Sequence, residues 1–428
     1  MKKIRYPAKE NWANILKRPS QDFEPLQKKI QPILDAVRKE GDEAVKRFTQ
    51  EFDQVNLKNL TVSQNEIEQA TSQIDQSLKE AIALAIKNIT AFHKSQLVEE
   101  KKVETSSGVF CWRKNLPIEK VGLYIPGGTA PLFSTVLMLG IPAVLAGCKE
   151  IILCSPPNQM GKIHPAVLYV ASQIGISKIY KAGGAQAIAA MAFGTKSIPK
   201  VDKIFGPGNQ FVTIAKQMLA NSEVAIDMPA GPSEVLVLAD KNANADFVAA
   251  DLLSQAEHGI DSQVIFITDD EPFLGKVNQE IFKQLANLPR KEIAEKSLEN
   301  SLLILVDNLD TGMKLSNFYA PEHLILMIEN YKKYESKIVN AGSVFLGPYS
   351  PEAAGDYASG TNHVLPTNGF AKNYSGVSMD SFMKKISFQE LSESGLKNIG
   401  PAIETMAEAE ELFAHKNAVS VRLKNYDY

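Results

Sequence analysis

The sequence has few cysteines and no long hydrophobic run. Its 428 residues include three cysteines, none in a CxxC pair: Cys111, Cys148 and Cys154. This spacing gives no disulfide framework and favours a reducing compartment, so we expect a cytoplasmic protein. The longest apolar stretch, Val136–Ala146, is interrupted by Gly140 and Pro142, and no apolar segment follows the first lysines. We therefore expect no signal peptide and no membrane partner.

An excess of one charge is also absent. Lysine and arginine number 46 against 49 aspartates and glutamates, which gives a net charge of -3. This balance argues against nucleic acid as a partner, because such proteins carry basic patches for the phosphate backbone. Hydrophobic residues make up 44% of the chain and charged residues 22%, as in folded globular proteins, and the length predicts two or more domains.

Two kinds of pattern divide the chain. From Asp22 to Leu97 apolar residues recur at spacings of three and four, which predicts helices. Further on, short apolar runs such as VGLYIPGG, EIILCSPP and EVLVLAD alternate with helical stretches, and a second set follows in SQVIFITDD, SLLILVDN, HLILMIEN and SVFLG. This alternation predicts βαβ units with parallel sheets, and its two occurrences predict two α/β domains.

Three glycine-rich turns, YIPGGTAP, AGGAQ and FGPGN, each follow a short strand and precede a helix. Backbone N–H groups and the helix dipole favour phosphate at such turns, so a nucleotide would fit there. None of them is a GxGxxG, and glycine at a strand-to-helix turn is often required only by tight geometry. A standard Rossmann cofactor site is therefore not predicted.

Two short motifs combine imidazole with other ligand-forming groups. In LLSQAEHG, Gln255 and His258 lie three residues apart near a helix end, where both could approach one ion. The alternative is an exposed Gln255 and a His258 that only caps the helix. In YAPEHLILM, Glu322 and His323 directly precede an apolar strand, and such a pair can activate water and act as a base. Adjacent polar residues at a strand start are also common by chance.

The polar stretch from Gly347 to Gly376 is longer than ordinary loops, and this length favours function. It contains Asp356 and His363, which could equally be ordinary loop residues. The chain ends in an amphipathic pattern with His415, and helical spacing makes Glu411 its neighbour on one face. Glu410 would lie about 140° away on such a helix.

Read together and in order, these segments resemble the histidinol dehydrogenase family, from about Gly41 to Leu423. The most specific stretches are GLYIPGGTAPLFSTVLML, GGAQAIAAMAFGT, VDKIFGPGN, AIDMPAGPSEVLVLAD, DLLSQAEHG, PEHLI, AGDYASGTNHVLPT and AHKNAV. The resemblance implies a two-step, four-electron oxidation of L-histidinol through L-histidinaldehyde to L-histidine. Two NAD accept the electrons, and the reaction is the last step of histidine biosynthesis.

The resemblance also implies roles for individual residues. One zinc ion per subunit would be held by Gln255, His258, Asp356 and His415. The catalytic pair would be Glu322 and His323. Substrate contacts would come from Ser233, Gln255, His258, Glu322, Asp356, His363, Glu410 and His415. The resemblance thus implies Glu410, whereas helical spacing favours Glu411. Contacts to NAD would come from Tyr124, Gln186 and Asn209, one in each glycine-rich turn.

The fold that the resemblance implies is α/β, with two incomplete Rossmann-like domains that contain parallel sheets. Small N- and C-terminal helical segments would be exchanged in a homodimer, so that the partner chain completes each active site. The expected parts are an N-terminal arm (1–24), a metal-binding and catalytic domain (25–121 with 235–375), an NAD-binding domain (122–234) and a C-terminal dimerisation segment (376–428).

Other functions are compatible with the bare patterns. A cysteine-dependent aldehyde dehydrogenase would use a thiol nucleophile, and Cys154 lies near a predicted strand end. A non-enzymatic nucleotide-binding module would need neither the zinc ligands nor the acid–imidazole pair. A zinc hydrolase would leave the three glycine-rich turns without a role.

Overall fold

The computed structural model describes residues 1–19, 23–127, 131–220, 222–228 and 231–424. The chain forms two compact units, one of residues 1–96 with 119–381 and one of residues 97–118 with 382–428. The first unit contains two parallel sheets, so the prediction of an α/β protein with parallel sheets is confirmed. Within the described residues, no helix has the length and apolar character needed to cross a membrane.

The larger sheet has six parallel strands in the order β1-β11-β10-β9-β12-β13. The strands are β1 (Lys2–Arg5), β9 (Glu234–Ala239), β10 (Gln263–Thr268), β11 (Leu302–Leu305), β12 (His323–Met327) and β13 (Ser343–Leu346). Apart from β1, they follow the 3-2-1-4-5 order of a doubly wound nucleotide-binding sheet. The four strands from β9 to β12 are buried along their whole length, which explains their continuous apolar sequences.

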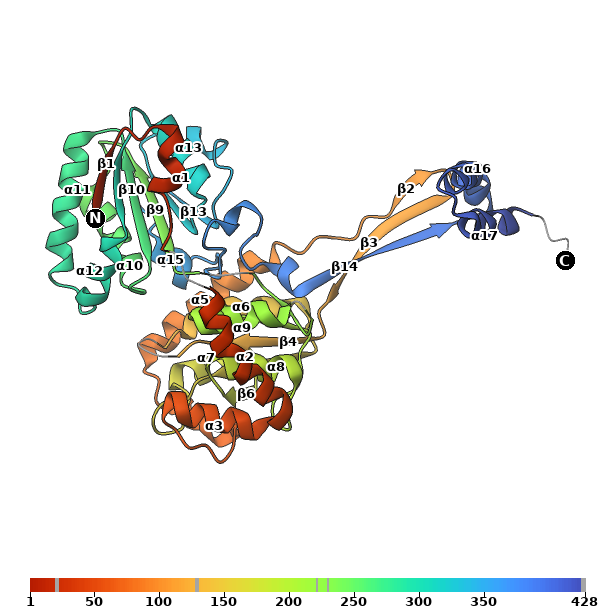
Figure 1. Cartoon of the computed structure of the whole chain (residues 1–428), viewed down its shortest axis with the longest axis horizontal. Coiled ribbons are helices and arrows are strands. Elements are labelled where there is room, and N and C mark those ends of the chain that lie inside the picture. The colour runs from red at the N-terminus through yellow and green to blue at the C-terminus, as the bar shows by residue number, and fades with distance from the viewer. Residues whose placement is uncertain (20–22, 128–130, 221, 229–230, 425–428) are drawn as a thin grey trace. The chain divides into compact units, whose positions relative to one another are not determined.

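Helices cover both faces of the six-stranded sheet, as Figure 1 shows. Val235 and Val237 point to one face and pack against α10 (Ala245–Ala256), α11 (Glu271–Leu285) and α12 (Lys291–Glu299). The alternate residues Leu236 and Leu238 point to the other face, where they pack with α1 (Trp12–Ile15) and α13 (Leu309–Tyr319). Shorter helices are η1 (Lys9–Asn11), α14 (Lys332–Glu335), α15 (Glu352–Tyr357), η2 (Phe370–Lys372) and η3 (Met379–Phe382).

The second parallel sheet has five strands in the order β6-β5-β4-β7-β8, which is again 3-2-1-4-5. The strands are β4 (Lys120–Tyr124), β5 (Glu150–Ser155), β6 (Lys178–Lys181), β7 (Lys203–Phe205) and β8 (Ala225–Ile226). The helices between them are α6 (Phe133–Ala146), α7 (Pro165–Gln173), α8 (Gly184–Phe193) and α9 (Gln210–Ala220).

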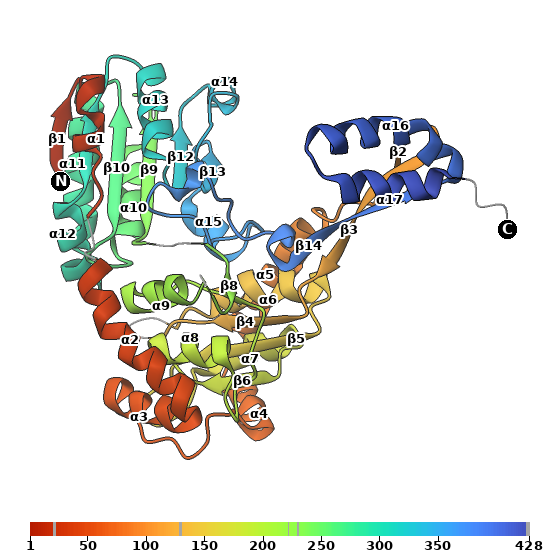
Figure 2. The same cartoon turned by 45° about the vertical axis from the view of Figure 1, so that its right-hand side comes forward.

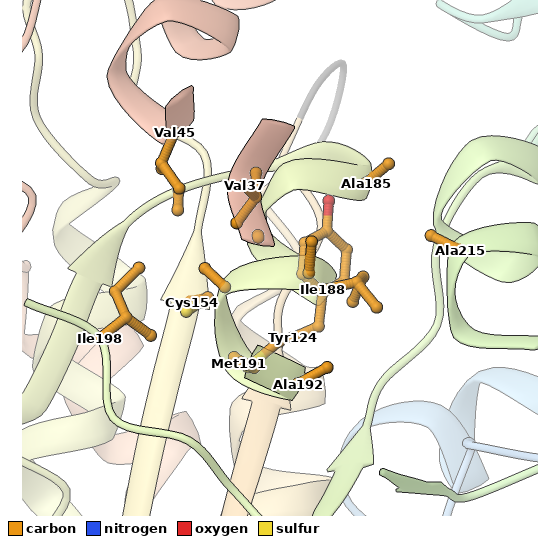
Figure 3. Packing of buried hydrophobic residues seen from close by; sticks show 14 of the residues in the cluster. Val37, Val45, Tyr124, Cys154, Ala185, Ile188, Met191, Ala192, Ile198 and Ala215 are labelled. Atoms are coloured by element: carbon orange, nitrogen blue, oxygen red, sulfur yellow. The ribbon is translucent and has the colours of Figure 1, made fainter. Parts of the chain in front are cut away.

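The N-terminal helices pack on the helices that flank this five-stranded sheet. They are α2 (Phe23–Glu40), α3 (Asp42–Asp53), α4 (Gln64–Ser72) and α5 (Gln76–Lys94). Val37 and Val45 enter the same buried cluster as Tyr124, Cys154 and Ile188 (Figure 3). The packing therefore differs from the expected grouping of residues 25–121 with residues 235–375, because the apolar faces of α2 and α3 meet α8 and its neighbours.

The expected N-terminal arm, residues 1–24, contains β1, whose four residues pair in parallel with β11. Trp12 then enters the core of the six-stranded sheet. The first residues are thus an edge of that sheet, because their backbone groups extend its hydrogen-bond ladder.

The second unit is an antiparallel sheet of β14 (Met383–Leu391), β3 (Val109–Pro117) and β2 (Val103–Ser106), with two helices, α16 (Glu393–Ala409) and α17 (Phe413–Leu423) (Figure 2). Trp112 of β3 stacks on Phe388 of β14 at 5.5 Å between ring centroids. The predicted C-terminal segment was residues 376–428. Its part from residue 382 onward is combined with residues 97–118, since β14 needs β3 as its partner, and residues 376–381 belong to the first unit.

Candidate active site and cofactor cavity

The predicted acid–imidazole pair lies at the amino end of β12. Ala320, with φ of 55°, ends α13 and turns the chain towards this strand. Glu322 and His323 are both buried, and each engages the backbone of Glu234 at the start of β9. The Glu322 carboxylate accepts the Glu234 N–H at 2.8 Å, and His323 Nδ1 lies 3.0 Å from the Glu234 carbonyl oxygen. The neighbouring strand therefore fixes both side chains.

This arrangement sets the protonation of His323. A carbonyl oxygen only accepts hydrogen bonds, so Nδ1 carries the proton and Nε2 keeps its lone pair. Nε2 is buried without a hydrogen-bond partner, 3.8 Å from Asp356 Oδ1. Burial lowers the pKa of His323 to about 3, with smaller contributions from His258 and His363. The imidazole is consequently neutral and can accept a proton at Nε2.

Helices α10 and α15 bring ligand-forming groups to the same edge of the sheet. Because α10 follows β9 and runs back along the sheet, its last turn lies near the amino ends of the strands. Gln255 lies in that last turn, and His258 follows the helix, which ends at Ala256. In α15, Glu352 and Asp356 are four residues apart and share one face. Ligand atoms of His258, Glu352 and Asp356 all lie within 4.8 Å of one another.

The amide of Gln255 has two possible orientations. In one, its nitrogen lies 3.4 Å from Glu322 Oε2 and its oxygen faces the Glu352 carboxylate. In the other, the nitrogen donates to Glu352 Oε1 at 2.5 Å and the oxygen accepts the Glu234 N–H at 3.1 Å. The second satisfies both amide atoms in the protein alone. A cation bound between the oxygens would stabilise the first.

The carboxyl groups of this cluster are strongly desolvated. Burial raises the pKa of Glu322 and of Glu352 well above the ordinary value, and nearby carboxylates add to the effect. Burial also raises the pKa of Asp356 to about 7. Glu352 Oε2 has no hydrogen-bond partner. The cluster offers one imidazole, carboxylate oxygens and an amide oxygen, and its carboxyl groups lack a compensating positive charge. These donor atoms and this charge match what a zinc ion needs.

Arg18 holds the strand that supports Glu322 and His323. Its guanidinium donates to both carboxylate oxygens of Glu234, at 2.5 and 2.8 Å, and to the carbonyl oxygen of Tyr319 at 2.8 Å. The Asn368 N–H donates to the same Glu234 carboxylate at 2.8 Å. This buried ion pair connects the first residues of the chain to the start of β9.

His363 and Ser233 lie beside the cluster. His363 Nδ1 is 3.1 Å from the Asp356 carbonyl oxygen, and His363 Nε2 is 3.1 Å from the hydroxyl of Thr135 on α6. Ser233 directly precedes β9, and its carbonyl oxygen accepts the Gln263 N–H at 3.1 Å. The first unit thus brings together seven of the predicted site residues: Ser233, Gln255, His258, Glu322, His323, Asp356 and His363.

Glu410 and His415 belong to the second unit, where both are exposed. Glu410 follows the last residue of α16, and His415 lies in the first turn of α17. The spacing argument for Glu411 was wrong, because the two helices are separate and Glu411 has φ of 59° in the turn between them. A helical face shared by Glu411 and His415 does not exist.

The three predicted NAD contacts line one cavity of about 1060 Å³: Tyr124, Gln186 and Asn209. Tyr124 and Ser155, the last residues of β4 and β5, place this cavity at the carboxyl ends of the strands. The Tyr124 hydroxyl accepts the N–H of Gly184 at the start of α8. Residues 128–130 of the first glycine-rich turn lie outside the described residues.

A buried ion pair shapes the third glycine-rich turn. Lys216 and Asp227 lie 2.5 Å apart, and they bind the carbonyl oxygen and the N–H of Gly206, each at 2.8 Å. Gly206 has φ of 129°, and a side chain there would collide with the Tyr124 carbonyl. These contacts hold the turn that carries Asn209.

Cys154, the nucleophile of the cysteine-dependent alternative, is fully buried in the core beside Tyr124 (Figure 3). Burial raises the pKa of its thiol far above the ordinary value. A thiol that is neutral and inaccessible is not a nucleophile, so this alternative has no support in the structure.

Sequence reasoning missed Glu352, Glu234 and Arg18. Glu352 could have been found from its spacing, because an acid one helical turn before Asp356 shares its face. Glu234 and Arg18 carry no such signal: they are 216 positions apart, and only the folded chain shows that they pair.

The fold and the site define an α/β enzyme with a buried acid–imidazole pair and a cavity at the glycine-rich turns. The sequence family described as histidinol dehydrogenase matches residues 16–423. Histidinol dehydrogenase of Bacteroides thetaiotaomicron is 62% identical over 423 residues, 99% of each chain. The chloroplastic enzyme of Arabidopsis thaliana is 53% identical, over 97% of this chain and 89% of that one. The crystal structure of histidinol dehydrogenase from Elizabethkingia anophelis is 58% identical, with a TM-score of 0.97 over 99% of this chain and 98% of that one.

The chain therefore belongs to the histidinol dehydrogenase family. Its members are oxidoreductases (EC 1.1.1.23) that use NAD and zinc and catalyse the last step of histidine biosynthesis.

Proposed function

We propose that this enzyme oxidises L-histidinol to L-histidine at the amino edge of the six-stranded sheet. The observation that carries the proposal is the neutral His323, whose Nδ1–H is held by the Glu234 carbonyl and whose Nε2 has no partner. A neutral imidazole with a free lone pair can take the proton of an alcohol.

The proposed zinc ligands are Gln255, His258 and Asp356 of one chain and His415 of a second copy, with one ion per subunit. Asp356 is the one carboxylate among these ligands, so the site with its dipositive ion would keep a net charge of about +1. Bound zinc would supply a Lewis acid that holds the neutral imidazole and the amine of L-histidinol. In the orientation of Gln255 that suits a ligand, the amide oxygen faces the Glu352 carboxylate.

His323 is the proposed base of both oxidations. In the first, the alcohol loses a proton to Nε2 and a hydride from its carbon, which gives the aldehyde. In the second, the aldehyde adds water, and the resulting hydrate loses a proton and a hydride to give the carboxylic acid. NAD, when bound, would supply the hydride acceptor for each step, so two molecules would account for the four electrons.

Glu322 is the proposed group that activates water for the second step. Its carboxyl is buried beside His323, and burial raises its pKa well above the ordinary value. A raised pKa makes the carboxylate a stronger proton acceptor once it is ionised. Ser233, His363 and Glu410 are the proposed further contacts to the substrate.

The cofactor would occupy the cavity of the five-stranded sheet, against Tyr124, Gln186 and Asn209. This sheet has the 3-2-1-4-5 order, and nucleotides bind such sheets at the carboxyl ends of the strands where the order reverses. Gln186 Oε1 is buried there without a hydrogen-bond partner, which leaves it free for a ligand. The three free cysteines fit a reducing, cytoplasmic location.

The active enzyme would be a homodimer in which the exposed C-terminal helices, with Glu410 and His415, complete the site of the partner. Exposed apolar residues on this unit, Met406, Leu412 and Phe413, suit such an interface.

Co-expression of two inactive variants, His323→Asn and His415→Asn, tests the exchange. If the sites are built across chains, each mixed dimer has one intact site and one site with both substitutions. Random pairing then restores about a quarter of wild-type activity. If each site is built from one chain, every site carries a substitution and the mixture stays inactive.

A further inference from the structure

The cofactor cavity has a wall that none of the three glycine-rich turns supplies. Helix α3 contributes Phe48, Phe52 and Asp53, although it precedes the sheet in the chain. The rings of Phe48 and Phe52 stack at 5.7 Å between centroids with an angle of 8° between their planes. Phe52 is 51% exposed, and Phe211 on the rim is 37% exposed. Exposed flat rings suit the face of a heterocyclic base.

Asp53 is unfavourably placed for the stability of the fold. It is the last residue of α3, where the helix dipole repels a carboxylate, and no basic residue lies in the last turn of this helix. Its Oδ2 is buried without a hydrogen-bond partner, and burial raises its pKa. A buried carboxylate oxygen without a partner lowers stability, so a ligand that donates to it would remove a penalty.

The charged groups around the cavity favour a ligand hydroxyl over a phosphate at this wall. Glu51 and Asp53 are acidic. Among the described residues that line the cavity, Lys29 is the one lysine or arginine. The N-terminus of α8, with Gly184 and Gln186, lies on another part of the lining and is the better place for phosphate.

We propose that the Asp53 carboxylate accepts hydrogen bonds from the hydroxyls of the adenosine ribose of NAD and thereby discriminates against NADP. A carboxylate can accept from both hydroxyls of a ribose, and it repels the 2′-phosphate that NADP carries in place of one of them. Adenine would lie against Phe52, beside Asp53 in the chain. The inference rests on the proposed function, because it requires NAD to occupy this cavity.

The test compares Asp53→Asn with Glu51→Gln, a matched loss of charge two residues away on the same rim. The measurements are KM and kcat for NAD and for NADP at saturating L-histidinol, and the thermal unfolding midpoint. We expect Asp53→Asn to raise the KM for NAD about tenfold, the effect of losing a hydrogen bond to a charged group. The ratio of kcat/KM for NADP to that for NAD should rise at least about tenfold, with kcat for NAD unchanged.

The unfolding midpoint of Asp53→Asn should equal or exceed that of the wild type, because a desolvated charge is removed. Glu51→Gln should leave the KM for NAD unchanged and raise the NADP to NAD ratio less than Asp53→Asn does. An unchanged KM for NAD and an unchanged NADP to NAD ratio in Asp53→Asn would overturn the inference. A lowered midpoint with unchanged cofactor preference would assign Asp53 a structural role and overturn it too.

A third variant separates this inference from the proposed function. Gln186→Ala removes another group that lines the same cavity. If Gln186→Ala raises the KM for NAD and Asp53→Asn does not, NAD occupies the cavity and only the role of Asp53 is wrong. If neither variant changes the KM for NAD, the cofactor lies elsewhere and both proposals fail.

Discussion

His323 Nδ1 lies 3.0 Å from the carbonyl oxygen of Glu234 on the neighbouring strand β9. This contact leaves the lone pair of Nε2 free, and the proposed role of His323 as a base depends on that lone pair. Changing His323 to Asn should lower kcat by on the order of 10² to 10⁴. Bound zinc should stay at the wild-type level, since His323 is not a proposed ligand. Steady-state kinetics with metal analysis of the same preparation checks both. Wild-type kcat in this variant would remove His323 as the base.

The proposed zinc ligands should respond differently to substitution. His258→Asn removes a nitrogen donor from the cluster with Glu352 and Asp356, so the purified variant should contain less than about a tenth of the wild-type zinc. His164→Asn is the matched control, because His164 lines the cavity of the five-stranded sheet and its substitution should leave the zinc content unchanged. Normal zinc occupancy in His258→Asn would exclude this residue from the ligand set.

Zinc binding should weaken in acid. Burial raises the pKa of Asp356 to about 7, so below that pH the carboxyl is protonated and must release its proton to bind the metal. The affinity should therefore fall by up to about tenfold for each pH unit below 7 and level off above pH 8. Calorimetric titration of the metal-free enzyme between pH 5.5 and 8.5 measures this. An affinity that is constant over this range would show that Asp356 is not a ligand that must lose a proton.

Predictability from the sequence differed between parts of the site. Gln255, His258, Glu322 and His323 stand in short motifs whose spacing already suggested a metal and a base. The two parallel sheets followed from the alternation of apolar runs and helical stretches, because strands buried on both faces need continuous apolar sequences.

Long-range packing was not predictable in this way. No pattern in residues 25–94 indicates that these helices pack on the five-stranded sheet, because an amphipathic face does not specify its partner. The break between α16 and α17 was also missed, since residues 403–423 read as one continuous amphipathic helix. Arg18 and Glu234 are paired only by the tertiary fold.

The buried ion pair of Arg18 and Glu234 should contribute to the stability of the fold. The side chains of Arg18 and Glu234 are 17% and 3% exposed, and removing the guanidinium leaves the carboxylate buried without its counter-ion. Arg18→Met should therefore lower the free energy of unfolding by about 3 kcal/mol, measured by urea denaturation. Arg5→Met is the control, because the pair of Arg5 with Glu271 is exposed and should contribute less than about 1 kcal/mol. Equal effects of the two substitutions would show that Arg18 does not anchor β9.

The most direct measurement is the amount of NADH formed per L-histidine from L-histidinol by the enzyme stripped with a chelator and then restored with zinc. The proposed mechanism predicts no turnover after stripping, recovery with zinc, and two NADH for each L-histidine. Full activity in the stripped enzyme, or one NADH with release of the aldehyde as the product, would contradict it.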